Sequence, residues 1–124
     1  MIEIFFHSEM KDNIVGNYLR AHRKKSGLHQ REVALLAGCR SQWDVARHER
    51  SKTLPPLLVA LSYEAIFQVP VSALFAGVSA TVRDVIEANV TELERQLESK
   101  CAKGREAEVI AEKLKWLKER RRKA

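Results

Sequence analysis

The sequence has few of the residues that build turns and break helices: three prolines and five glycines among 124 residues. This scarcity argues against a β-rich fold and against a low-complexity chain. Long stretches consist instead of Leu, Ala, Glu, Lys and Arg, which all favour helices. The length suffices for one compact domain with an appendage. We therefore expect an all-α protein.

Cysteine is equally scarce, with Cys39 and Cys101 far apart in the chain. They form no CxxC pair and no histidines stand at ligand spacing, so we expect no metal site and no cofactor. Both thiols are expected to be free in a reducing cytoplasm. No apolar run reaches the ~18 residues of a membrane span. The apolar start at residues 1–6 lacks the basic segment of a signal peptide.

Catalytic patterns are missing as well. The four histidines are scattered, and no glycine loop, acid pair or nucleophile motif accompanies them. Such a set offers nothing to assemble into an active site. We therefore predict that the protein is not an enzyme.

Carboxylates are scarce in the middle of the chain. Residues 11–78 contain ten Lys and Arg against five Asp and Glu, whereas residues 79–124 interleave twelve positive with nine negative charges. A basic middle segment is typical of proteins that bind nucleic acid. The mixed charges of the last segment are typical of a solvated helix.

Apolar periodicity and capping residues predict five helices in this middle segment. By residue number they are 12–25, 30–37, 42–49, 55–67 and 71–75. Gly27 and Gly38 are expected to follow helix ends, Ser41 to cap the third helix, and Gly77 to close the fifth. Two short helices joined by a glycine-containing turn at 38–40 are the helix-turn-helix signature. The expected inward-facing residues are Ile14, Val15, Tyr18, Leu19, Val33, Ala34, Leu36, Val45, Leu57, Ala60, Leu61 and Phe67.

An amphipathic segment begins near Thr81. The residues Val82, Ile86, Val90, Leu93 and Leu97 recur every three or four positions, Lys103-Gly104 interrupts them, and Ile110, Leu114 and Leu117 continue the stripe. This pattern predicts either a helical hairpin or a kinked helix with a narrow apolar seam. The expected organisation is a dispensable extension over residues 1–10, with Met10 as an alternative start. A DNA-binding domain over 11–78 and a helical extension over 79–124 follow it.

Several motifs follow one another at regular spacing along residues 17–75. These are Tyr18-Leu19-Arg20, Ser26–Gln30, Val33–Gly38, Ser41–Arg50, Pro55-Pro56-Leu57, Phe67–Val71 and Leu74-Phe75. By their order and spacing, this half of the chain resembles the lambda-repressor-like helix-turn-helix domain of the Xre family. The resemblance implies a five-helix fold that binds DNA with the third helix, and it implies that Gln30 braces Gln42.

The sequence departs from the family pattern at four places. His29 replaces the usual Ser or Thr cap, and the turn after Gly38 is one residue longer than usual. Ser51 stands where a glycine is common. Glu64 occupies a position that is normally small and apolar, where it either pairs with Arg20 or Arg23 or faces solvent.

Three residues of the third helix are candidates for reading bases. Gln42 can bond bidentately to adenine and Arg47 to guanine, each with about 1–3 kcal/mol of discrimination. Trp43 either contacts a thymine methyl group or packs inside the protein. The third helix also carries Asp44, which accepts from cytosine or pairs with Arg40 or Arg47, and His48, which we expect to be packed.

Other residues are candidates for positioning the DNA backbone. The expected phosphate contacts are Gln30, Arg40, Ser41, Arg50, Lys52, Arg23 and Lys24. For the cluster Arg23-Lys24-Lys25 the alternative is a complement to the dipole at a helix C-terminus. Glu49 is expected to tie the helix end to a neighbouring cation or backbone group.

These features predict a cytoplasmic transcriptional regulator of double-stranded DNA. We expect a repressor that binds a palindromic operator as a homodimer, with residues 79–124 as the dimerisation segment. The alternative is an antitoxin-type protein whose C-terminal helices bind a partner protein while the helix-turn-helix autoregulates.

Overall fold

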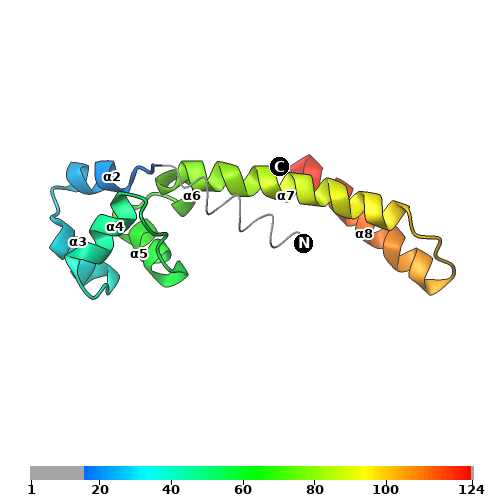
Figure 1. Ribbon diagram of the computed structural model, residues 1–124, viewed down its shortest axis with the longest axis horizontal. Coiled ribbons are helices and arrows are strands. Elements are labelled where there is room, and N and C mark those ends of the chain that lie inside the picture. Colours follow the sequence, from blue (N-terminus) through cyan, green and yellow to red (C-terminus); the bar gives the residue numbers. More distant parts are fainter. Residues whose placement is uncertain (1–15, 124) are drawn as a thin grey trace. The chain divides into compact units, whose positions relative to one another are not determined.

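The computed structural model describes residues 16–123, and every regular element in that range is a helix (Figure 1). An all-α architecture was expected. The predicted extension over residues 1–10 and the predicted helical residues 12–15 lie outside the described range. The helices are α2 (Leu19–Ser26), α3 (Gln30–Ala37), α4 (Gln42–Glu49), α5 (Leu57–Phe67), α6 (Val71–Leu74), α7 (Ala76–Glu98) and α8 (Arg105–Lys123).

The chain divides into two compact units between Val82 and Arg83. None of the helices in residues 16–123 is both long enough and apolar enough to cross a membrane.

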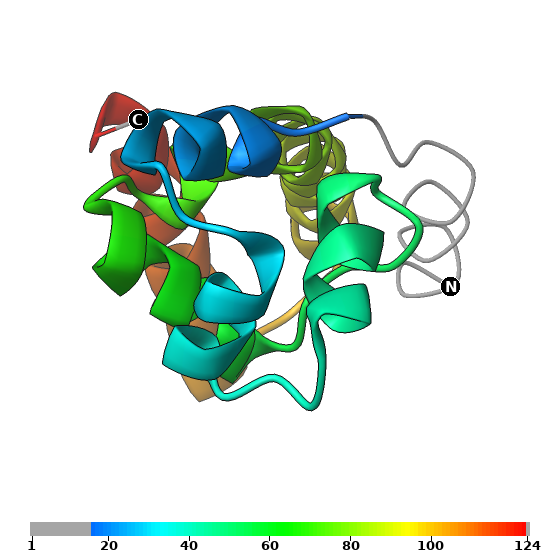
Figure 2. The ribbon, with the colours of Figure 1, turned by 90° about the vertical axis from the view of Figure 1, so that its left-hand side faces the viewer.

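The helices of the first unit surround one apolar core. Figure 2 shows α2, α3, α4 and α5 around a common centre, which is filled by side chains from each of them and from α6. Burying each large apolar side chain contributes about 1.5–3 kcal/mol. The fully buried ones are Leu19, Val33, Val45, Tyr63 and Leu74.

Several predicted helix ends are confirmed by backbone geometry. Gly27 and Gly38 have φ angles of 80° and 71°, in the left-handed region that suits a residue without Cβ at a helix C-terminus. Ser41 caps α4, because its Oγ accepts the backbone N–H of Trp43 at 3.3 Å.

The first predicted helix begins later than expected. Residues 16–18 are not helical and α2 starts at Leu19. The Asn17 side chain accepts the Leu19 N–H at 2.9 Å, and the Tyr18 N–H donates to the Leu74 carbonyl at 2.9 Å. These bonds satisfy the backbone without another helical turn, and they leave Tyr18 exposed rather than inward.

Some expected core residues are on the surface. Leu36, Leu57 and Leu61 are exposed, whereas Ala60 and Tyr63 form the buried side of α5. The sequence Leu57–Phe67 is apolar almost throughout, so its periodicity does not determine which side turns inward. Tyr63 occupies the core because its hydroxyl has a buried partner there.

The predicted break at Gly77 does not occur. The α6 helix ends at Leu74, and α7 begins at Ala76 and continues through Gly77. A glycine inside a helix costs only about 1 kcal/mol, and Val78 packs against the core of the first unit beside it. The predicted start of the amphipathic helix near Thr81 is therefore five residues too late.

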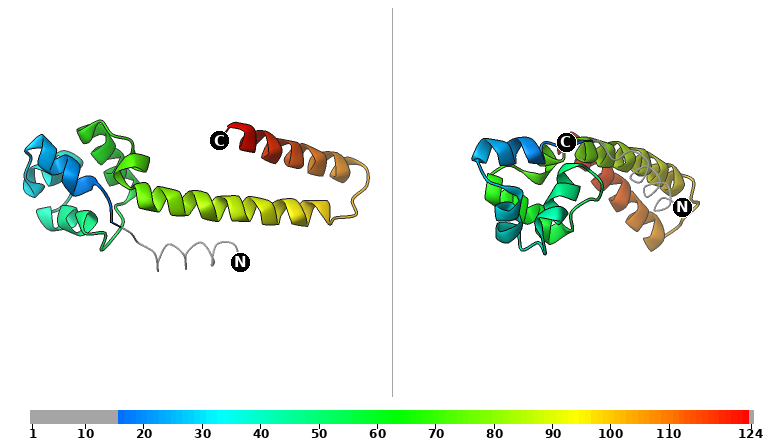
Figure 3. Two further views of the ribbon diagram at one scale, coloured as in Figure 1. Left: turned by 90° about the horizontal axis from the view of Figure 1, so that it is seen from above. Right: turned by 60° about the vertical axis from the view of Figure 1, so that its left-hand side comes forward.

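The second unit is a helical hairpin, one of the two arrangements expected. In Figure 3 α8 runs back alongside α7 after the turn at residues 99–104. Its seam contains Ile86, Val90, Leu97, Ile110, Leu114 and Leu117. Arg120 bonds Glu87 at 2.9 Å, and Arg121 pairs with Glu94. Val82 lies outside this seam and Leu93 is 39% exposed, so neither has its predicted place.

Candidate functional site

A four-residue turn, residues 38–41, connects α3 to α4, and the two helices pack against each other. Val45 and Ala46 place the inner side of α4 in the core, with exposed fractions of 0% and 4%. The core therefore determines which side of α4 remains available to a ligand.

The carboxyl-terminal end of α4 is held by a buried carboxylate. Glu49 accepts two hydrogen bonds from the Arg23 guanidinium, at 2.5 and 3.2 Å, and one from the Gln30 side chain at 3.1 Å. The Glu49 side chain is 2% exposed and that of Arg23 is 12% exposed. This ion pair and the Gln30 amide connect α2, α3 and α4. Glu49 was expected to tie the helix end to a neighbouring cation or backbone group, and the cation is Arg23.

The residues after α4 are also fixed. Ser51 has a φ of 57°, a left-handed conformation in which glycine is favoured. The Asn17 amide donates to the Ser51 hydroxyl at 3.1 Å and to the His48 carbonyl at 2.8 Å. Ser51 stands where the family commonly has glycine, and the Asn17 side chain holds the strained turn that results.

His48 faces the core, as expected. Its Nδ1 and the Tyr63 hydroxyl are 2.6 Å apart. Burial lowers the pKa of His48 and raises the pKa of Tyr63, so the hydroxyl keeps its proton and can donate it to a neutral imidazole. This pair joins α4 to α5.

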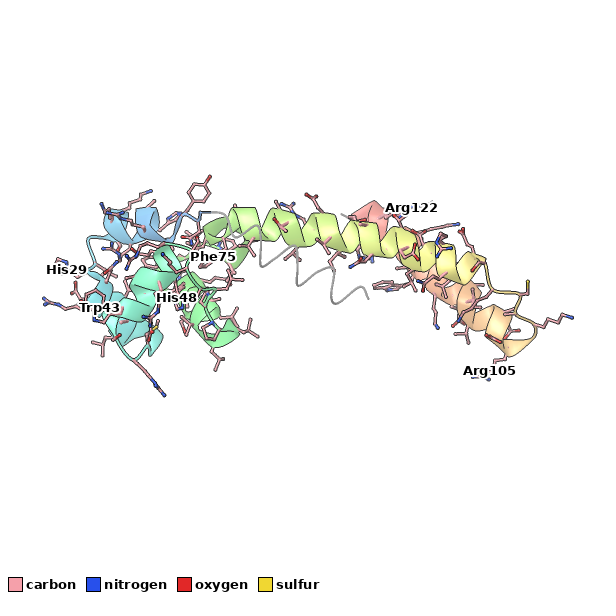
Figure 4. The ribbon with its side chains drawn as sticks, viewed as in Figure 1. His29, Trp43, His48, Phe75, Arg105 and Arg122 are labelled. Atoms are coloured by element: carbon pink, nitrogen blue, oxygen red, sulfur yellow. The ribbon has the colours of Figure 1, made fainter. Side chains whose placement is uncertain are left out.

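The opposite side of α4 is open. Trp43 is 60% exposed, which excludes the core alternative for this residue (Figure 4). Gln42 is partly exposed, and its side chain makes no hydrogen bond within residues 16–123. Arg47 pairs with Asp44 one turn before it, with side-chain exposures of 49% and 28%. Of the alternatives expected for Asp44, pairing with Arg47 is the one observed.

Two hollows adjoin this side of α4. One, of about 420 Å³, is lined by Arg23, His29, Gln30, Arg31 and Gln42. The other, of about 270 Å³, is lined by Arg20, Arg23, Gln30, Trp43, Ala46, Glu49 and Arg50. The backbone N–H groups of Gln30 and Arg31, at the N-terminus of α3, have no partner within the described residues. Free N–H groups and a positive helix end attract anions.

The remaining expected positioning residues are distributed around α4. Arg40 and Lys52 are exposed in the turns before and after it, and Lys24 is exposed near the end of α2. The Arg50 side chain bonds the Ala46 carbonyl at 3.4 Å. Ser41 caps α4. Arg23 differs from these, because its charge is already paired with Glu49.

Two expectations from the resemblance are altered by the observed contacts. The Gln30 side chain bonds Glu49, and no bond from Gln30 to Gln42 occurs within residues 16–123. Glu64 neither pairs with an arginine nor faces solvent freely. Its carboxylate accepts the Val71 N–H at 2.8 Å, at the start of α6.

Sequence reasoning missed several residues of the site. Arg20 and Arg31 line the hollows beside Trp43 and Gln42. Arg20 stands three residues before Arg23 on one helix side, and Arg31 stands in the first turn of α3, so their spacing could have indicated them. The bracing role of Asn17 left no pattern, because its partners are 31 and 34 residues away.

Comparison with known proteins finds no matching family model, no matching curated protein and no matching solved structure.

Removing the buried carboxylate should destabilise the first unit. Glu49→Ala leaves the Arg23 guanidinium without its partner in a site of low exposure, and we expect a loss of about 3 kcal/mol in the free energy of unfolding, measured by urea denaturation. Glu92→Ala is the matched control, because Glu92 forms an exposed pair with Arg95 and its removal should leave the free energy of unfolding nearly unchanged. Equal losses in both variants would contradict the bracing role.

Acid should weaken the contact between α4 and α5. The pKa of His48 is lowered in the folded state, so the unfolded chain binds the proton more readily. Stability is then complete above the unfolded pKa of about 6.5 and falls as the pH decreases below it. We expect His48→Gln to reduce this dependence in thermal melts at a series of pH values. His22→Gln should retain it, and an unchanged slope in His48→Gln would rule out His48 as its source.

Proposed function

We propose that the first unit is a five-helix, lambda-repressor-like helix-turn-helix domain that binds double-stranded DNA in a sequence-specific manner, with α4 in the major groove. The observation that carries the proposal is the division of α4 into two sides. Val45, His48 and Glu49 are buried and hold the helix, while Trp43 is exposed and Gln42 is partly exposed at its N-terminal turn. A helix that reads bases needs this combination of rigid support and open first turn.

The chemistry of the open side supports the same proposal. Gln42 offers an amide donor and acceptor that match adenine, and Trp43 offers an apolar surface for a thymine methyl group. Arg47 reaches guanine once its exposed pair with Asp44 opens, at a cost of less than about 1 kcal/mol. Asp44 is then free to accept from a cytosine amino group.

The surroundings of α4 supply phosphate contacts. The candidates are Arg20, Lys24, Arg31, Arg40, Arg50 and Lys52, together with the free N–H groups at the start of α3. Such contacts set the register of the protein on the duplex but carry no sequence information. The basic balance of residues 11–78 provides the long-range attraction.

The regulatory role follows from the size of the domain. One small module seldom holds an operator alone, so we propose a transcriptional regulator, with repression as its mode, that binds a two-fold symmetric site as a homodimer. Such a protein acts in the cytoplasm on chromosomal DNA and needs no cofactor or catalytic residue.

A second candidate function is an antitoxin-type protein whose hairpin binds another protein. The observation that favours it is Trp116, which is 62% exposed on α8 together with Val109 at 37%. Large exposed aromatics are enriched where proteins meet. A small toxin-like reading frame beside this gene would favour the second candidate, and its absence would favour the first.

Selection of bound sites from random duplexes tests the proposed function directly. We expect an enriched palindrome with half-sites about one helical turn apart. Gln42→Ala and Arg47→Ala should each weaken binding to the selected site by about 5- to 150-fold and relax the preference at one position. The controls Gln96→Ala and Arg105→Ala, in the second unit, should bind like the unaltered chain. No enrichment, or full binding by both α4 variants, would exclude the proposal.

Salt should weaken the complex steeply. If about six phosphates are contacted, the logarithm of the association constant falls against the logarithm of the salt concentration with a slope near −5, because each contact releases condensed counterions. Arg31→Ala should reduce the slope by about one without altering the selected sequence. Fluorescence anisotropy titrations over a range of salt provide the measurement. A slope near zero would remove the electrostatic part of the proposal.

A further inference from the structure

An apolar surface is exposed on α3 and α5. Its members, which we call the leucine face, are Leu35, Leu36, Leu57, Leu58 and Leu61, with exposed fractions of 82, 58, 72, 79 and 46%. The two helices pack against each other, and Leu57, Leu58 and Leu61 are exposed on α5 whereas Ala60 and Tyr63 are buried. Isolated exposed leucines need no explanation, but five on two neighbouring helices do.

The α5 part of the leucine face is poor in polar groups. Glu64 is the one charged residue of α5, and its carboxylate is bonded to the Val71 N–H. The Ser62 hydroxyl donates to the Leu58 carbonyl at 2.7 Å. A charged or strongly polar ligand would find few groups to bond with here. The chemistry of this surface suits another apolar surface of a protein.

The size of the leucine face suits a protein contact. Five leucines that each expose roughly half or more of their surface supply on the order of 500 Å² of apolar area, against about 800 Å² for each partner in a standard interface. Leu54, 40% exposed just before α5, extends the same area. The face therefore supplies most of what one partner contributes to a stable contact.

A second copy of this chain is the partner that fits best. The first unit has more basic than acidic residues, and the exposed leucines of α5 carry no charge, so two copies can approach each other there without charge repulsion between those side chains. A contact between two identical apolar surfaces is self-complementary and is closed by two-fold symmetry. None of the leucine-face residues lines the hollows beside Gln42 and Trp43. Gln42 and Trp43 would therefore remain open in both copies.

The hairpin is less suited to this task. Its apolar seam is filled within the hairpin itself, where Val90, Leu97 and Leu117 are 8, 5 and 5% exposed. An amphipathic stripe that looks unpartnered in the sequence is therefore already covered by its own second helix. The stripe on which dimerisation through residues 79–124 was expected is thus filled within one copy, and the large apolar residues still exposed on α8 are Val109 and Trp116.

We propose that the leucine face is the homodimer interface of this protein, with α3 and α5 of one copy against the same helices of the other. A dimer formed in this way would bind two half-sites of an operator. Only this consequence for DNA rests on the proposed function. The oligomeric state itself can be measured without DNA.

Sedimentation equilibrium of the full chain is the test. The unaltered protein should show a reversible monomer–dimer equilibrium. The double variant Leu57→Gln with Leu58→Gln should raise the dimer dissociation constant by about 100-fold or more, because two apolar side chains lose their burial. Leu35→Gln, on α3, should raise it by about 10-fold. All three positions are exposed within the chain, so thermal melts should be nearly unchanged.

Leu93→Gln is the matched control, because it removes an exposed leucine from the hairpin and should leave the dissociation constant as it was. The inference is overturned if the unaltered chain is monomeric, if both leucine-face variants dimerise normally, or if only Leu93→Gln disrupts the dimer.

Binding to a selected duplex separates this inference from the proposed function. The double variant should bind a single half-site like the unaltered chain and lose the preference for two half-sites. If the dimer depends on the leucine face but no duplex is selected by any form, the interface stands and the DNA-binding proposal fails.

Discussion

The carboxylate of Glu49 is held by Arg23 of α2 and Gln30 of α3 at the end of α4. A buried charge is tolerated only where its partners satisfy it, so this group requires three helices to take one arrangement. The contribution of this group to a single arrangement of the helices matters more here than its contribution to the free energy of folding. It sets the position from which the open side of α4 faces outward.

Other contacts of the first unit also fix the position of α4. The bond between His48 and Tyr63 ties α4 to α5, and the Asn17 amide holds the left-handed Ser51 after the helix. Together with Val45 in the core, these contacts leave little freedom to the inner side of α4. Gln42 and Trp43, by contrast, have no hydrogen-bonding partner for their side chains in the described part of the chain. Rigid support beneath unsatisfied groups is the arrangement that favours an external ligand.

Local sequence signals predicted most of the helices, but they predicted less well where α2 begins and which side of α5 is buried. Glycines in the left-handed conformation and the Ser41 cap act within a few residues, so the ends of α3 and α4 could be predicted. The start of α2 depended on Asn17 and on a bond from Tyr18 to the distant Leu74, and the prediction was wrong there. In α5, where nearly every residue is apolar, periodicity could not separate Tyr63 from the exposed leucines. Which side of α5 faces the core depends on how the other helices pack against it.

The sequence by itself determined the helical class, the turn between α3 and α4, and the residues available on α4, because propensity, capping and charge are properties of short segments. The tertiary structure alone decided which of those residues are free. It paired Arg23 with Glu49, turned Glu64 to the Val71 N–H, exposed Trp43 and covered the seam of the hairpin. These outcomes depend on side chains that lie far apart in the chain, and their distances are set only when the helices pack.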